Sequence, residues 1–143
     1  MAAANEDALS QRLLEIEYVR RELEEYLTAI NSLQLTQESI NKSLEGLTSL
    51  KNGAEAFIPY SQDILFKGRI EDTDKGLVNI GSNIFKSLTK DKIRDKLEAD
   101  LKEVGDNINK LAQMVQSLQQ EGSRLEQEAN RMYEEYRTSL QKS

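Results

Sequence analysis

Cysteine, histidine and tryptophan are absent from the 143 residues, and Pro59 is the single proline. Without cysteine the chain can form no disulfide framework, so an oxidising compartment receives no support. Without histidine or cysteine it lacks the commonest general base, the thiol nucleophile and the usual ligands of transition metals. A phosphate-binding loop of the GxxxxGK type is missing too. These absences predict a protein that is not an enzyme and uses no metal or cofactor.

Long apolar runs and an excess of basic residues are also missing. No apolar stretch approaches the ~20 residues that a membrane helix needs, and the opening sequence MAAANEDALS lacks the basic and apolar regions of a signal peptide. The formal net charge is −6, whereas nucleic-acid binding depends on clustered Lys and Arg. We therefore expect a cytoplasmic protein that binds neither membrane nor nucleic acid.

Two long helices account for most of the chain. Charged residues make up 31% and apolar residues 38% of it, which suits solvated helices with a narrow apolar seam. The first helix is expected over residues 5–50, with Asn5 as its N-cap and Gly53 in the turn that ends it. Its heptad seam, in which only Gln37 and Arg12 are not apolar, consists of Leu9, Ile16, Leu23, Ile30, Gln37 and Leu44 and of Arg12, Val19, Tyr26, Leu33, Ile40 and Leu47.

The second helix is expected over residues 90–141, with Ser87 or Thr89 as its cap. Its seam weakens at Gly122 and Ala129, which indicates either a looser, splayed end or a close approach of the two helices. Neither helix could be stable alone in water, so we expect an antiparallel pair with both termini at one end. The seam comprises Leu97, Val104, Leu111, Leu118, Leu125 and Met132 and also Leu101, Ile108, Val115, Gly122, Ala129 and Tyr136.

The middle, residues 54–89, has the alternation of β-strands. Strands are predicted over residues 55–60, 64–70, 77–81 and 83–88, as two hairpins or as a four-stranded meander. Pro59 suggests an edge or a strand end, and Gly68 a bulge or a close contact. The predicted fold is therefore α+β and mostly α: a single domain in which a long antiparallel coiled coil carries two central β-hairpins.

Such hairpins are marginal alone, because they bury little and leave unpaired backbone groups at their edges. We expect strands of other subunits to complete them, and closure into a barrel would remove the edges. A local mini-core against the helix ends is the alternative for some of the side chains. The predicted oligomerisation residues are Phe57, Ile58, Ile64, Phe66, Ile70, Val78, Ile80, Ile84 and Phe85.

The order of helix, FIPYSQDILFKGRIEDTDKGLVNIGSNIF and helix resembles the alpha-class subunit of prefoldin, also called GimC, over nearly the whole chain. The matching motifs are the apolar-Pro-apolar step at residues 58–60, the second strand at 66–70, the acidic turn at 72–75 and the third strand at 78–81. Two hairpins rather than one are typical of the alpha class. The family usually has Gly-x-Gly after the third strand, whereas this chain has Gly81-Ser82-Asn83, and asparagine tolerates the positive φ that the turn requires.

The resemblance implies a cytosolic hexamer of two alpha-class and four beta-class subunits. Their hairpins would form a double β-barrel from which six coiled-coil arms project. The family holds non-native proteins at the arm tips without ATP and passes them to a group II chaperonin. These properties are expectations from the resemblance, and neither composition nor periodicity indicates them.

Apolar residues near the two termini lie outside the main stripe, where a two-helix seam does not need them. Exposed apolar clusters usually mark interaction sites, and tyrosine and methionine suit varied partners. The alternative is that these residues broaden the seam at a frayed end. The predicted client-binding residues are Leu9, Leu13, Leu14, Met132, Tyr133, Tyr136 and Leu140.

The sequence thus predicts an ATP-independent chaperone subunit that holds unfolded proteins. A coiled-coil scaffold or spacer, which oligomerises through its β-hairpins and binds no client, is the alternative. Aggregation assays with partner subunits would separate the two.

Overall fold

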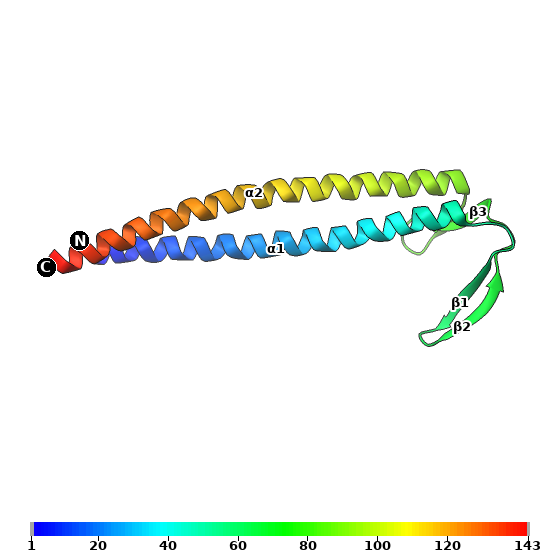
Figure 1. Cartoon of the computed structure of the whole chain (residues 1–143), viewed down its shortest axis with the longest axis horizontal. Helices are drawn as coiled ribbons and strands as arrows, with labels where there is room; N and C mark the ends of the chain where they lie inside the picture. Colours follow the sequence, from blue (N-terminus) through cyan, green and yellow to red (C-terminus); the bar gives the residue numbers. More distant parts are fainter. Residues whose placement is uncertain (1, 143) are drawn as a thin grey trace. The chain divides into compact units, whose positions relative to one another are not determined.

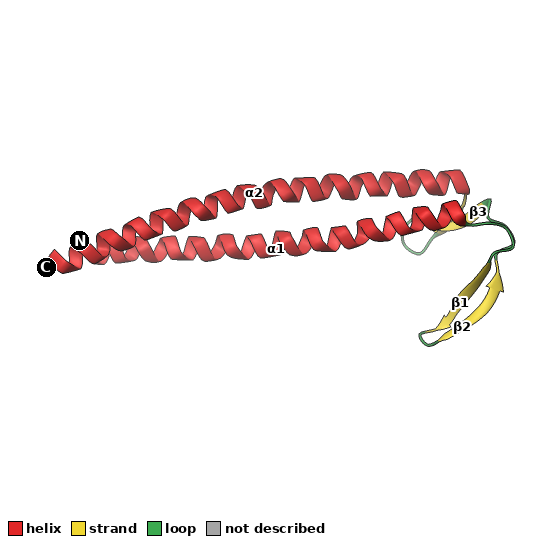
Figure 2. Ribbon diagram, viewed as in Figure 1, coloured by secondary structure: helices red, strands yellow, loops and turns green. Residues whose placement is uncertain are grey.

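The computed structural model describes residues 2–142 and contains two long helices and four strands. The order is α1 (Ala2–Ser49), β1 (Glu55–Ser61), β2 (Ile64–Arg69), β3 (Lys75–Asn79), β4 (Phe85–Thr89) and α2 (Lys90–Lys142) (Figures 1 and 2). The α+β, mostly α architecture predicted from the sequence is confirmed. The chain falls into two compact units.

The first unit, called here the helical unit, combines α1 up to Gln34 with α2 from Asp106 onward. Its two helices run antiparallel, and the labels of the two chain ends lie side by side in Figure 1. Two ion pairs join the helices: Arg12 Nε lies 3.1 Å from Glu128 Oε2, and Arg20 lies 3.3 Å from Glu126. Its core cluster consists of Ile16, Val19, Leu125 and Ala129, with Leu9, Leu23 and Leu118 packed around it.

The predicted heptad seams are confirmed in both helices. Every residue assigned to a seam position is buried or half-buried, including the polar exceptions Arg12 and Gln37. Arg12 lies at the seam because its guanidinium reaches Glu15 and Glu128, so its aliphatic stem can lie along the seam while its charge is paired. The periodicity alone therefore identifies the face that each helix buries.

The helix ends agree with the prediction only in part. Asn5 is not the N-cap, because α1 already begins at Ala2; three alanines precede Asn5, and alanine has the highest helix propensity. Thr89 does cap α2, since its Oγ1 accepts a hydrogen bond from the backbone N–H of Lys92 at 3.3 Å. Gly53 has a φ of 79°, in a turn that follows the end of α1 at Ser49.

The second unit, called here the hairpin unit, comprises residues 35–105. Its strands form two separate antiparallel sheets, β1–β2 and β3–β4, so the two-hairpin alternative holds and the meander does not. The third and fourth strands lie about two residues away from their predicted bounds, at Lys75–Asn79 and Phe85–Thr89. Pro59 lies within β1, and the strand register shifts between it and Ser61.

Polar contacts connect the segments at the base of the two hairpins. Asn52 Oδ1 accepts hydrogen bonds from the backbone N–H and the hydroxyl of Thr73, at 2.8 and 2.7 Å. The backbone N–H of Lys90 donates to the carbonyl of Asp74 at 2.8 Å, and its Nζ donates to the carbonyl of Leu50 at 3.2 Å. These bonds fix where each hairpin leaves the helices.

The turn between β3 and β4 uses three consecutive residues with positive φ. Gly81, Ser82 and Asn83 have φ values of 122°, 50° and 59°. The side chain of Asn79 stabilises the turn by accepting a hydrogen bond from the N–H of Gly81 at 2.9 Å. Asn83 therefore takes up the left-handed conformation that the sequence comparison with Gly-x-Gly predicted for it.

Candidate interaction surfaces

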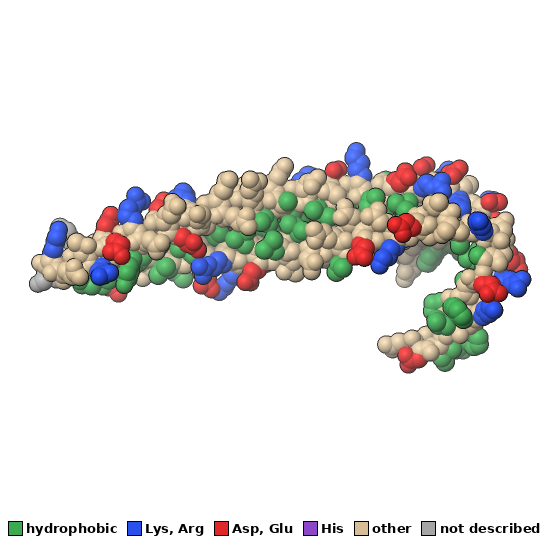
Figure 3. All heavy atoms as spheres, in the orientation of Figure 1, with side chains coloured by type: hydrophobic (Ala, Val, Ile, Leu, Met, Phe, Trp, Pro, Cys, Tyr) green, Lys and Arg blue, Asp and Glu red, His purple; other side chains and the backbone are tan. Residues whose placement is uncertain are grey.

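The β1–β2 hairpin exposes apolar side chains on both of its faces. The register places Ile58 opposite Phe66 on one face, and Tyr60 meets the Phe66 ring edge-on with centroids 5.4 Å apart. The other face carries Phe57 and Leu65. All five side chains are exposed, Tyr60 by 74%, and the space-filling view shows hydrophobic atoms along this hairpin (Figure 3). An isolated two-stranded hairpin with such a surface is marginal in water.

Charged side chains gather at the base of the same hairpin. Glu55 begins β1 opposite Arg69, and its Oε1 lies 3.3 Å from Lys67 Nζ and 3.9 Å from the Arg69 guanidinium. One carboxylate is therefore shared between two cations. These pairs are exposed and contribute little to stability, but they leave the base of β2 positively charged.

Gly68 lies at a close contact rather than at a bulge. A Cβ atom at this position would lie 2.6 Å from Cδ1 of Ile58, so the isoleucine side chain occupies the space above the glycine. The close-contact alternative predicted for Gly68 therefore holds, and the register irregularity lies instead beyond Pro59.

The β3–β4 hairpin differs, because one of its faces is covered within the unit. A Cβ atom at Gly76 would lie 2.9 Å from Cδ1 of Ile93, which places the start of α2 against this face. Val78 and Leu88, on the same face, are half-buried. The opposite face carries Leu77 and Phe85, which are exposed.

Most of the predicted oligomerisation residues are exposed in the single chain. Ile70 and Val78 are the two that are half-buried. The prediction omitted three exposed apolar residues of the strands, Tyr60, Leu65 and Leu77, although it included residues from both faces of β1. The remaining predicted residues, all exposed, are Phe57, Ile58, Ile64, Phe66, Ile80, Ile84 and Phe85.

Near the termini, the predicted client-binding residues separate into two groups. Leu9, Met132 and Tyr136 are half-buried in the seam. The other four are exposed by half or more of their surface, namely Leu13, Leu14, Tyr133 and Leu140. The off-seam residues thus remain accessible, whereas the seam residues can contribute only a part of their surface.

Tyr18 belongs to the same exposed surface, although the sequence reasoning missed it. It lines a shallow groove of about 300 Å³ with Leu14, Val19 and Leu125. The negative charge of Glu22, and then its hydrogen bond, raise the pKa of the Tyr18 phenol, so this side chain stays neutral. Its position one helical turn after Leu14, off the heptad seam, was the signal that could have identified it.

The helices are not splayed at Gly122 and Ala129. A Cβ atom at Gly122 would lie 3.4 Å from Cγ1 of Val19, and Ala129 is buried. Leu125, between them, is the most buried large side chain of the described residues at 1% exposure. The small residues thus allow close helix approach, so this alternative holds and the looser-end interpretation is wrong.

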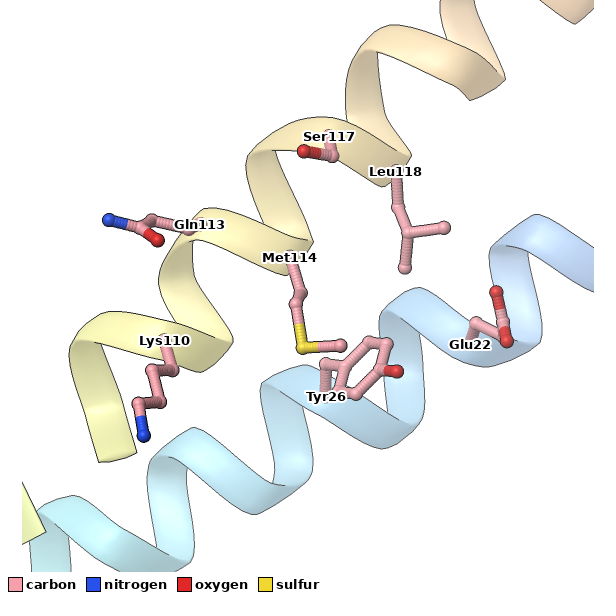
Figure 4. A pocket seen from close by; sticks show the side chains of 7 residues that line it. All are labelled: Glu22, Tyr26, Lys110, Gln113, Met114, Ser117 and Leu118. Carbon is pink, nitrogen blue, oxygen red and sulfur yellow. The ribbon is translucent and has the colours of Figure 1, made fainter. Parts of the chain in front are cut away.

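A second groove of the helical unit lies farther along the two helices, with a volume of about 570 Å³. Figure 4 shows the Met114 side chain pointing toward the ring of Tyr26, with Leu118 on the same side. Met114 is exposed and lies outside the heptad seam. Glu22 and Lys110 add charge of both signs to the rim.

Within residues 2–142, no group of three or more Asp or Glu side chains is arranged to hold a metal ion. The helices of this described part are too polar for any of them to cross a membrane.

Comparison with known proteins gives three findings. A family model described as "Prefoldin subunit" matches residues 19–135. The chain is 29% identical over 104 residues to "Prefoldin subunit alpha" of Methanobrevibacter smithii, covering 73% of this chain and 63% of that protein. A structure titled as filamentous PFD from Methanocaldococcus jannaschii is similar with a TM-score of 0.47 and 23% identity, over 90% of this chain and 98% of that chain.

Proposed function

Because the chain belongs to the prefoldin family, we propose that it is an alpha-class subunit of an ATP-independent chaperone that holds unfolded proteins. Prefoldin is a family of chaperones and not of enzymes. In this proposal the hairpins join other subunits, the ends of the helices near the termini bind clients, and residues 1–143 act as one prefoldin-like domain. Its place of action is the cytoplasm.

The observation that carries the proposal is the unequal burial of apolar side chains. The hairpin unit holds many large apolar side chains, yet none of the described ones in it is fully buried. Burying one such side chain contributes roughly 1.5–3 kcal/mol, so a partner that covers several of them would bind stably. We propose two alpha-class with four beta-class subunits as the assembly.

The client site is proposed on the exposed surface of Leu13, Leu14, Tyr133 and Leu140, and we now add Tyr18. The half-buried Leu9, Met132 and Tyr136 would border it. A single arm would bind weakly, and several arms on one client would gain affinity through effective concentration. Transfer of the client to a group II chaperonin is the proposed next step. Without client binding, the chain would be a scaffold or spacer.

The test is suppression of client aggregation by the complex assembled with beta-class prefoldin subunits. Substitution of Leu13, Leu14, Tyr133 and Leu140 by serine is expected to reduce this suppression while the mass of the complex is unchanged. Unchanged suppression by an intact complex would reject the client site.

A matched pair of variants locates the effect. Leu13→Ser with Leu14→Ser removes two exposed leucines near the terminus, and Leu27→Ser with Leu35→Ser removes two exposed leucines elsewhere on α1. The first pair is expected to weaken suppression more than the second. If both pairs reduce the suppression of aggregation equally, any exposed apolar residue on the arm contributes. If neither pair reduces it, the scaffold alternative is favoured.

A further inference from the structure

Two of the grooves in the helical unit lie end to end. One is lined by Leu14 and Tyr18 of α1, and the other by Glu22 and Tyr26. These residues follow one another at a spacing of four, so they form one ridge along α1. The hydrogen bond between Tyr18 and Glu22 marks the point where the grooves meet. The combined feature, called here the long groove, extends for about 18 Å along α1 at roughly 1.5 Å per residue.

The second wall of the long groove comes from α2. Leu125 is buried beneath the first part, Met114 is exposed beside the second part, and Glu121 lies between them in the sequence. In Figure 4 Lys110 lies at one end of the second part and Glu22 at the other, with the Met114 side chain between them. The long groove therefore has an apolar floor, two carboxylates near its middle and a lysine at one end.

An apolar groove between two helices suits a third helix better than an extended segment. The backbone groups of α1 and α2 along the groove are bonded within the helices themselves. An extended segment on this floor would cover its own N–H and C=O groups without gaining backbone partners, whereas a helix satisfies its own. Amphipathic helices bind such grooves through one apolar stripe, and about three helical turns match the length of the long groove.

The charge of the long groove describes the residues that flank this stripe. Glu22 and Glu121 form no ion pair with a cation of residues 2–142, whereas the nearby Glu15 and Glu126 are paired with arginines. A helix that carries Lys or Arg beside its apolar stripe would supply the missing cations. A second copy of this chain is poorly matched, because its own net charge is −6.

We propose that the long groove binds an amphipathic helix of a non-native client, with the apolar stripe of that helix on the floor and its Lys or Arg residues opposite Glu22 and Glu121. This inference rests on the proposed function, because Leu14 and Tyr18 belong to the proposed client site. It extends that site along the arm to Met114 and names the class of client segment: helical, apolar on one side and basic beside it.

The probe is a fluorescently labelled peptide of leucine and lysine, about three helical turns long, whose leucines repeat with the helical period. Fluorescence anisotropy measures its binding to the full-length chain, and circular dichroism checks that each variant is folded. Tyr18→Ala and Met114→Ala remove exposed side chains from the two parts of the groove, and each is expected to weaken binding about tenfold. Leu27→Ala, an exposed residue of α1 outside both parts, is the matched control and should have little effect. If only one of the two groove variants weakened binding, the long groove would not be one site.

Neutralisation of the carboxylates tests the charge of the partner. Glu22→Gln combined with Glu121→Gln is expected to weaken binding of the peptide several-fold, and added salt should reduce the difference from the unmodified chain, because attraction between charges is screened. Glu24→Gln, an exposed glutamate of α1 outside both parts of the groove, is the matched control. A peptide with glutamate in place of lysine should bind more weakly to the unmodified chain. Equal binding of the two peptides would overturn the requirement for a basic partner.

A second peptide tests the requirement for a helix. It has the same composition, but its leucines and lysines alternate, so that its apolar residues share one face of a strand rather than of a helix. This peptide is expected to bind about tenfold more weakly than the helical one, because it cannot place all of its leucines on the floor while satisfying its backbone groups. Equal binding of the two isomers would contradict the helical partner.

Met114 separates this inference from the proposed function, because it lies outside the client site proposed above. In the complex with beta-class subunits, Met114→Ala is expected to reduce the suppression of client aggregation. If the unmodified complex suppresses aggregation and Met114→Ala does so equally well, the proposed function stands and the inference is wrong. If the unmodified complex suppresses none, the proposed function is wrong. Self-association of the chain alone that Met114→Ala abolishes, measured by sedimentation velocity, would assign the groove to a second copy and overturn the client helix.

Discussion

The helical unit and the hairpin unit differ in where their apolar side chains find contacts. Among the described residues, the five buried hydrophobic ones all belong to the helical unit, namely Ile16, Val19, Val115, Leu125 and Ala129. The strands of the hairpin unit are rich in apolar residues, and none of them is buried in the single chain. The helical unit thus forms a core within the chain, whereas the apolar side chains on the strands of the hairpin unit are left without one.

The difference follows from geometry. A helix presents one apolar stripe, which a single partner helix can cover, and here small residues bring the partner close. A two-stranded hairpin has two faces and two edges, and covering them requires more elements than this chain contains. The β3–β4 hairpin is intermediate, because Ile93 of α2 covers one face at Gly76.

The largest effect on the free energy of unfolding is expected when one large apolar residue of each unit is replaced by alanine and the two changes are compared. Leu125→Ala should lower the free energy of unfolding of the chain alone by about 2–5 kcal/mol, because it opens a cavity in the core. Phe66→Ala should change it by less than about 0.5 kcal/mol, because that side chain is exposed. Chemical denaturation followed by circular dichroism measures both.

In the complex with beta-class subunits the ranking of the two substitutions is expected to change, since Phe66→Ala should then reduce assembly. A large destabilisation of the isolated chain by Phe66→Ala would show that the hairpin has a core of its own, and the contrast between the units would fail.

A smaller effect is expected at the helical glycines. A Cβ atom at Gly105 would meet no atom within 4 Å beyond the backbone of its own helix, so Gly105→Ala should stabilise the chain by about 1 kcal/mol through helix propensity. Gly122→Ala should gain less, because its Cβ would meet Val19 at 3.4 Å. Gly122→Leu should destabilise, because the longer side chain would separate the helices.

Thermal unfolding of the three glycine variants ranks them. If Gly122→Leu were as stable as Gly105→Ala, the helices would not be closely packed at this point, and the looser-end interpretation would return.

The smallest effect concerns pH at the exposed end of the helical unit. Glu22→Gln should lower the pKa of Tyr18, because the charge of Glu22 is the largest cause of its elevation. The raised pKa favours the folded state below the unfolded value of about 10, and this contribution is lost as the pH rises through the folded pKa. Titration of tyrosinate absorbance, with Tyr18→Phe to assign the signal, checks the shift. An unchanged titration curve in Glu22→Gln would contradict the role of Glu22.

Much of the fold could be predicted because periodicity is a local property of the sequence. The seam residues of both helices, the two hairpins and the cap at Thr89 all follow from short-range patterns. The N-terminus of α1 was predicted incorrectly, because a good capping residue at Asn5 competes with three preceding alanines that extend the helix. The bounds of β3 and β4 were displaced, since the turn at residues 81–83 uses two non-glycine residues with positive φ.

The candidate surfaces could be predicted less completely. The exposure of a strand residue such as Leu77 depends on which neighbours are close, so the local pattern does not identify it. The same limit applies to Gly122, whose small side chain is compatible with either a loose end or a tight contact until Val19 is placed against it.

The amino-acid sequence by itself determined the heptad stripes, the presence of two hairpins and the charge of each segment, because these depend on residue types and their spacing. Only the tertiary structure decided that Leu125 is the most buried of the large described side chains, that Ile93 covers one face of the second hairpin, and that the first hairpin remains exposed on both faces. The physical reason is that burial is a relation between segments distant in sequence, so local patterns cannot specify which surfaces stay uncovered.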